Sequence, residues 1–337
     1  MNEELIKEEK EVSQLINKLD TLKKEIAKVI VGQEKTIDQL LITFLAGGHA
    51  LLEGVPGLAK TLMIRTLSQA IDLDFRRIQF TPDLMPSDIV GTEILEEDHS
   101  TGKKFFKFNK GPIFSNIVLA DEINRTPPKT QAALLEAMQE FEVTYSGQTY
   151  PLDRPFLILA TQNPIEQAGT FPLPEAQLDR FLLYIQIDYP EEQQELNILK
   201  STTGGKSASV EKVMAGEEII KLQSLVRQVP ISDDLVGFVN QVIRATRPKT
   251  TAIDYVKDWV SWGAGPRAGQ AMILTAKAHA LLQGRYAVTK ADIDTVALPV
   301  LRHRVLVNFK AEAEGVTSDD VTSHLLKTIN LSINGAG

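Results

Sequence analysis

The sequence predicts an α/β fold, in which helices flank a parallel β-sheet and a smaller all-helical domain follows. Short apolar segments of strand length alternate with helical patterns as far as about Pro190. Beyond that residue helical patterns dominate, and no segment reads as a convincing core strand. Buried strands that alternate with helices are typical of a parallel sheet covered on both faces.

Five short segments are expected to form the sheet, and most of them are largely apolar and bounded by polar or turn-forming residues. They are Ala50–Leu52, Phe75–Phe80, Ile117–Ala120, Phe156–Ala160 and Leu182–Ile187. Helices are predicted within this part at Lys60–Ile71 and Lys129–Glu140. Two further segments, Pro82–Gly111 and Glu142–Leu152, interrupt the alternation and are expected to be hairpins or loops inserted into the core.

The remaining patterns are helical. Apolar side chains recur three or four residues apart over Glu3–Ile30, which predicts an amphipathic helix ahead of the sheet. Five helices are expected in the second domain, at Glu191–Lys200, Gly216–Gln228, Asp233–Thr246, Arg267–Gln283 and Lys290–His303. The small polar residues of Thr202–Ser209 predict a loop. The expected domains are an N-terminal helix (1–30), an α/β core (31–190) with inserts near 82–111 and 142–152, and a helical lid (191–337).

The composition excludes several kinds of chemistry. There are no cysteines among the 337 residues, so disulfides, thiolate nucleophiles and cysteine-based zinc sites are excluded. No two of the five histidines have the i, i+4 spacing of a helix-borne metal site, so packing or surface roles are expected for them. The net charge of −8 argues against a general nucleic-acid binder.

A cytoplasmic protein without a membrane span is expected. The longest apolar runs are strand-sized, well short of a membrane-spanning helix. The N-terminal residues MNEELIKEEKEV are acidic and lack the apolar core of a signal peptide.

The most informative motif is GVPGLAKT at Gly54–Thr61, which lies between a predicted strand and a predicted helix. Its spacing is that of the P-loop GxxxxGK[ST], with Ala59 at the place of the second glycine. Backbone N–H groups of such a loop point at an anion. Lys60 is expected near the β- and γ-phosphates of ATP, and the Thr61 hydroxyl is expected on Mg²⁺. Alanine loses some backbone freedom here but is expected to take helical dihedral angles.

Two more motifs are expected at the same edge of the sheet, because each follows a predicted strand. Asp121 and Glu122 end the apolar run IVLA. Asp121 is expected to hold Mg²⁺, and Glu122 to orient and polarise the attacking water. Asn163 follows the next strand in ATQNP. From the residues alone, two roles remain open for it: a hydrogen bond to the water or γ-phosphate, and a turn-forming asparagine before Pro164.

The segments GVPGLAKT, LADEINR, ATQNP, LPEAQLDRF and GPRAGQ together resemble the MoxR-type AAA+ ATPases. The segment RVLVNFKAEAEGV resembles their closing segment, so the likeness runs from about Val31 to Val316. It implies a P-loop AAA+ core with a helical lid, and ATP and Mg²⁺ as cofactors. Alanine at the last glycine position of the P-loop is a common form in this family.

The resemblance also assigns roles to individual residues. Asn163 resembles sensor 1, and Arg267 resembles the sensor 2 arginine of the lid. Arg180 resembles the arginine finger that reaches the γ-phosphate of a neighbouring subunit. Arg125 is a weaker candidate for an interface contact. The inserts resemble the helix-2 insert and the hairpin before the sensor strand. Nucleotide contacts are expected from Val31, Gly32 and Gln33, which resemble the segment that packs on adenine, and from Gly54, Val55, Pro56, Gly57, Leu58, Ala59, Lys60, Thr61 and Leu62.

An arginine finger that acts in trans requires assembly, so a homo-oligomer, specifically a hexameric ring, is expected. The resemblance implies an ATP-driven remodeller or assembly chaperone, with a client protein complex and a partner that carries a von Willebrand factor A domain. Three alternatives remain. A nucleic-acid motor would show DNA-stimulated hydrolysis, and a magnesium-chelatase-type ATPase subunit would co-purify with a chelatase partner. A nucleotide-dependent scaffold would bind ATP and hardly turn it over.

Overall fold

The central sheet has five parallel strands in the order β2-β5-β8-β1-β9. The computed structural model describes residues 2–97, 99–100, 102–165, 169–202 and 209–334. The strands are β1 (Ala50–Glu53), β2 (Phe75–Gln79), β5 (Ile117–Asp121), β8 (Leu157–Gln162) and β9 (Leu183–Gln186). All five predicted strands are therefore present, and the α/β fold class is confirmed.

Helices cover both faces of the sheet. Successive side chains of a strand point to opposite sides, and in this sheet the side chains on both sides are apolar. In β5, Ile117 and Leu119 join one apolar core, whereas Val118 and Ala120 join another. The first core is shared with α1 (Asn2–Ala27), α2 (Glu34–Leu45) and α3 (Lys60–Ala70), and the second with α4 (Pro86–Val90) and α5 (Pro128–Glu140). Helix α2, which the sequence analysis did not predict, contributes Leu40 and Phe44.

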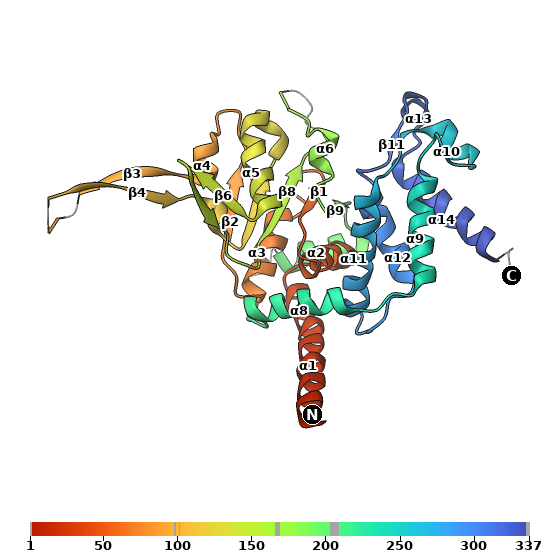
Figure 1. Cartoon of the computed structure of the whole chain (residues 1–337), viewed down its shortest axis with the longest axis horizontal. Coiled ribbons are helices and arrows are strands. Elements are labelled where there is room, and N and C mark those ends of the chain that lie inside the picture. Colours follow the sequence, from red (N-terminus) through yellow and green to blue (C-terminus); the bar gives the residue numbers. More distant parts are fainter. Residues whose placement is uncertain (1, 98, 101, 166–168, 203–208, 335–337) are drawn as a thin grey trace.

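Both inserted segments contain antiparallel hairpins. Strands β3 (Gly91–Glu97) and β4 (Lys104–Lys110) form a long arm that projects from the core (Figure 1), and β6 (Glu142–Tyr145) pairs with β7 (Gln148–Pro151). At the base of the arm the two strands and α4 approach closely. A side chain at Gly111 would overlap the backbone of Ile89, and Gly91 has a φ of 107°. Glycine is therefore required where the arm leaves the core.

A helical lid lies on the other side of the molecule (Figure 1). The C-terminal helices are α7 (Glu192–Thr202), α8 (Gly216–Gln228), α9 (Asp233–Ala245), α10 (Asp254–Trp259), α11 (Pro266–Leu282), α12 (Lys290–Leu301), α13 (Phe309–Glu314) and α14 (Ser318–Asn334). One short ribbon was not predicted: β10 (Val260–Trp262) pairs with β11 (Leu306–Val307). Most of the loop expected at Thr202–Ser209 lies outside the described residues.

The lid packs against the core through a continuous set of apolar side chains that joins lid residues to α2 and to β9. Strand β9 forms one edge of the sheet, and α12 packs against it. Along the chain, the short helix α6 (Glu175–Leu178) lies between β8 and β9. Among the described residues, no helix is long and apolar enough to cross a membrane.

Candidate active site

The P-loop encloses a cavity of about 460 Å³ at the carboxyl edge of the sheet. Its walls are the loop from Pro56 to Leu62 together with Arg77, Asp121, Glu122, Thr161 and Asn163. The two strand-end motifs predicted from the sequence therefore meet the P-loop in one place. Gly54 precedes the cavity and lies against the end of β9, where a side chain would come within 2.8 Å of the Ile187 carbonyl oxygen.

Two residues of the loop have left-handed backbone conformations. Gly57 has a φ of 90°, and space is open where a side chain would stand, so the dihedral angle and not crowding requires glycine. Ala59 has φ 55° and ψ 23°. The expectation that Ala59 would take ordinary helical angles is therefore wrong: it adopts the left-handed conformation that suits a glycine. Helix α3 begins directly afterwards, at Lys60.

The ammonium group of Lys60 lies inside this cavity and donates a hydrogen bond to the Gly54 carbonyl oxygen. Burial lowers the pKa of Lys60, while the nearby carboxylates of Asp121, Glu122 and Glu53 act in the opposite direction. Within the described part of the chain, the Gly54 carbonyl is the only hydrogen-bond partner of this half-buried cation, which is therefore well placed to bind an anion.

The acidic pair is held by residues that the sequence analysis missed. Asp121 Oδ2 accepts hydrogen bonds from Arg77 Nε at 2.9 Å and Nη2 at 2.6 Å. The hydroxyl of Thr161 donates to Asp121 Oδ1 at 2.5 Å and accepts from the Glu122 backbone N–H at 2.9 Å. Thr161 stands in the motif that drew attention to Asn163, whereas Arg77 gave no signal because its partner is distant in sequence.

Glu122 follows the strand in a left-handed conformation, with a φ of 58°, which turns its side chain back toward the sheet edge. Its Oε2 accepts a hydrogen bond from Gln79 Nε2 at 2.9 Å and lies 3.1 Å from Arg125 Nε. Arg125, the weaker interface candidate, thus pairs with Glu122 of its own chain. Both contacts fix the carboxylate at the cavity wall.

Asn163 combines features of the two roles left open for it. Its Oδ1 accepts a hydrogen bond from the Ile165 backbone N–H at 3.1 Å, which is the contact of a turn-forming asparagine. Its Nδ2 is buried and has no hydrogen-bond partner among the described residues. A buried amide donor without a partner is unfavourable unless a ligand or water accepts from it. Asn163 therefore fits an oxygen-rich ligand in the cavity that it lines.

These residues suit a nucleotide and Mg²⁺. The amide of Asn163, the ammonium of Lys60 and the start of α3 provide donors for phosphate oxygens. Thr61 and Asp121 line the same cavity and provide oxygen ligands. Within the described part of the chain, no group of three or more His, Asp or Glu side chains is placed to hold a metal. Mg²⁺ fits the oxygens of Thr61 and Asp121, because it commonly uses one or two protein oxygens together with substrate phosphates.

The segment expected at the adenine lies beside the end of β9. Gln33 Nε2 donates to the Asp188 carbonyl oxygen at 3.2 Å, and Gly32, with a φ of 76°, leaves room for the Gln194 side chain. The P-loop residue Gly54 touches Ile187, directly before Asp188. The segment at Val31–Gln33 and the P-loop are therefore neighbours at one sheet edge.

Arg180 and Arg267 are not among the residues that line the cavity. Arg180 follows α6, and its Nη1 donates to the Leu135 carbonyl oxygen of α5 at 3.0 Å. Arg267 stands in the first turn of α11 and lies 3.5 Å from Asp179 Oδ2, with 56% of its side chain exposed. Neither arginine completes the nucleotide cavity of its own chain in this structure.

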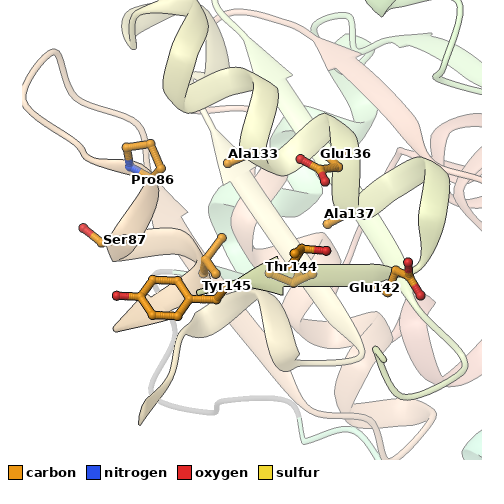
Figure 2. A pocket seen from close by; sticks show the side chains of 10 residues that line it. Pro86, Ser87, Ala133, Glu136, Ala137, Glu142, Thr144 and Tyr145 are labelled. Carbon is orange, nitrogen blue, oxygen red and sulfur yellow. The ribbon is translucent and has the colours of Figure 1, made fainter. Parts of the chain in front are cut away.

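A separate groove of about 190 Å³ lies between α4, α5 and β6. Figure 2 shows Ser87 and Tyr145 at one end of it and the carboxylates of Glu136 and Glu142 toward the other. It shares no lining residue with the P-loop cavity. The groove, with its apolar lining and acidic end, lies near the bases of the β3–β4 and β6–β7 hairpins.

Comparison with known families matches this architecture. Residues 49–183 match the family described as "ATPase family associated with various cellular activities (AAA)", and residues 255–325 match the AAA lid domain. The fold is thus that of the AAA class of ATPases.

Individual relatives narrow the class. The chain is 42% identical to Chaperone MoxR1 of Mycobacterium tuberculosis, over 91% of this chain and 80% of that protein. It is 30% identical to Protein MoxR of Paracoccus denitrificans, over 83% and 86% of the two chains. A crystal structure from Cytophaga hutchinsonii, provisionally described as an ATPase, superposes with a TM-score of 0.88 at 42% identity and covers 96% of this chain and 98% of that one. The chain belongs to the MoxR family of AAA ATPases.

Proposed function

We propose that this protein hydrolyses ATP to ADP and phosphate, with Mg²⁺, in the P-loop cavity, and that it does so as a ring-shaped homo-oligomer. The observation that carries the proposal is the convergence of Lys60, Thr61, Asp121, Glu122 and Asn163 on one cavity. An ammonium, a hydroxyl, two carboxylates and an unpaired amide donor are the groups that phosphoryl transfer to water uses.

Each side chain then has a defined task. Lys60 binds phosphate oxygens in place of the Gly54 carbonyl, and Asn163 donates its free amide N–H to the γ-phosphate or to the water. Glu122 polarises that water, and Gln79 and Arg125 keep its carboxylate in place. Thr61 and Asp121 would hold Mg²⁺, which neutralises phosphate charge when it is bound. Catalysis of this kind rests on positioning and electrostatics.

Assembly follows from the position of Arg180. A guanidinium that stabilises charge on the γ-phosphate contributes roughly 10³–10⁵-fold in rate. Because Arg180 lies outside the cavity of its own chain, we assign it to the cavity of a neighbouring subunit. A ring of subunits, with six as the expected number, would give every cavity such an arginine. Arg267 is proposed to sense the nucleotide from the lid.

The biological role proposed is that of a chaperone-like remodeller of protein complexes. One relative is named a chaperone, and the projecting β3–β4 arm carries exposed Leu95 and Phe106, which suit contact with another protein. A client complex and a partner with a von Willebrand factor A domain stay predictions, as does the cytoplasmic location. The net charge of −8 disfavours the nucleic-acid motor.

Steady-state ATP hydrolysis measured across protein concentration tests the assembly. The turnover per subunit should rise as subunits associate, and Arg180→Ala should lower it by roughly 10³-fold at full assembly. Arg227→Ala, which removes an exposed arginine of α8, is the matched control and should retain parental turnover. Constant turnover per subunit in a species that sizes as a monomer would refute the trans-acting arrangement. DNA-stimulated hydrolysis or co-purification with a chelatase subunit would favour an alternative.

A further inference from the structure

The lid holds the chain segment that carries Arg180. Three consecutive lid residues after α12, Arg302, His303 and Arg304, form what we call the clasp. Arg302 Nη1 donates to the Tyr184 carbonyl oxygen at 2.7 Å, and His303 Nε2 donates to that of Phe181 at 3.0 Å. The clasp therefore contacts the backbone of β9 and of the segment between α6 and β9, where Arg180 is located.

Arg304 is the centre of the clasp. Its side chain is only 4% exposed. Nε donates to Asp179 Oδ1 at 2.7 Å, and Nη2 donates to the Phe181 carbonyl oxygen at 2.7 Å. Nη1 donates to the Val300 carbonyl oxygen of α12 at 2.6 Å. The same guanidinium is thus fixed to a lid helix and to residues on both sides of Arg180.

Asp179 receives a second lid arginine. Arg304 occupies Oδ1 of its carboxylate, while Arg267 lies 3.5 Å from Oδ2. Arg267 stands at the start of α11 and is more than half exposed, so its pairing is the weaker and more exchangeable of the two. The carboxylate directly before Arg180 thus connects to two separate parts of the lid.

The contacts of Arg180 differ from those of its neighbours. Its backbone lies within the clasped segment, yet among the residues that the structure describes its side chain donates a hydrogen bond to Leu135 of α5 and not to the lid. The lid consequently sets where the Arg180 backbone lies without occupying its guanidinium. A buried guanidinium with several fixed acceptors transmits a displacement better than exposed side-chain contacts do.

From these contacts we infer that Arg304 and Asp179 are positioning residues for Arg180: the lid of each subunit holds the arginine that acts on its neighbour. The inference rests on the proposed trans-acting ATPase. A change in the lid angle at one nucleotide site would move Arg180 at the next. A misplacement of a catalytic group by about 1 Å lowers the reaction rate by about 10²-fold. A small movement of the lid, and with it of Arg180, therefore suffices to control ATP hydrolysis in the neighbouring subunit.

Mixed oligomers test this directly. A Lys60→Ala subunit has a defective cavity but donates Arg180, whereas an Arg180→Ala subunit has an intact cavity but no finger. Mixing the two should restore hydrolysis at interfaces where the first donates to the second. Adding Asp179→Asn to the donor subunit should lower this restored rate by at least about 10-fold, whereas the same change in the receiver should lower it at most about twofold.

Arg304→Lys is the second variant. It should likewise lower the restored rate when it is in the donor subunit and not when it is in the receiver. Arg285→Lys is the matched control, since Arg285 pairs with buried Asp292 inside the lid, and in the donor it should change the rate at most about twofold. Should Arg304→Lys fail to fold, Asp179→Asn decides, because Asp179 is partly exposed. If a substitution lowers the restored rate equally in the donor and in the receiver, or in neither, Arg304 and Asp179 do not position Arg180. If the mixture of Lys60→Ala and Arg180→Ala subunits, without further substitutions, restores no hydrolysis, both the trans-acting arrangement and the positioning role of the clasp are wrong.

Discussion

The left-handed conformation of Ala59 makes a quantitative prediction about stability. For a residue other than glycine, such a conformation costs roughly 1–2 kcal/mol, and Ala59 has a φ of 55°. Glycine removes this strain but loses more conformational freedom on folding, which costs about 0.5–1 kcal/mol. Ala59→Gly is therefore expected to raise the free energy of unfolding by about 0.5–1 kcal/mol, although it deletes a methyl group.

Urea unfolding of the nucleotide-free protein measures this effect. With a denaturant slope of about 3 kcal/mol/M, the midpoint should rise by about 0.2–0.3 M. The matched control is Ala132→Gly, at an exposed position inside α5. There the same substitution should lower the free energy of unfolding by about 1 kcal/mol. If both variants are destabilised to the same extent, the backbone of Ala59 is not strained.

Three further predictions follow from other features. Burial, with Arg154 nearby, lowers the pKa of His49 from 6.5 to about 4, so in this range His49 binds a proton mainly in the unfolded state. His49 should therefore contribute about 3 kcal/mol to the loss of stability from pH 6.5 to pH 4, and His49→Gln should reduce the slope of that profile by this amount in unfolding experiments. Gly111→Ala should destabilise the arm by about 1–3 kcal/mol, seen as faster hydrogen exchange in β3 and β4, and unchanged exchange would contradict the crowding at its base. Asn163→Ala should lower turnover by about 10²–10³-fold with ATP affinity largely kept, and a loss confined to affinity would exclude a role in the chemical step.

The sequence predicted the elements that depend on local pattern. Most of the strands are found because they are short, largely apolar runs between polar residues, and α8 matches its predicted span residue for residue. The core motifs were found for a related reason: the P-loop, and likewise the pair Asp121 and Glu122, each consist of residues that are contiguous in sequence. Their meeting in one cavity follows from parallel strands, whose carboxyl ends share an edge.

What the sequence did not predict depends on tertiary contact. Arg77 and Thr161 support Asp121 from neighbouring strands, and no local pattern reveals that pairing. The clasp residue Arg304 reaches Asp179 across 125 positions of sequence. The conformation of Ala59 was mispredicted because the following helix favoured ordinary helical angles, whereas the turn of the loop imposes left-handed ones.

Hydrolysis of ATP in the cavity around Lys60 should depend on Glu122. Single-turnover hydrolysis is measured alongside equilibrium ATP binding for the parent, Glu122→Gln and Lys60→Ala. We expect Glu122→Gln to bind ATP as the parent does but to cleave it at least about 10²-fold more slowly, and Lys60→Ala to lose affinity for ATP. Cleavage by Glu122→Gln at the parental rate, with binding intact, would show that Glu122 does not polarise the attacking water.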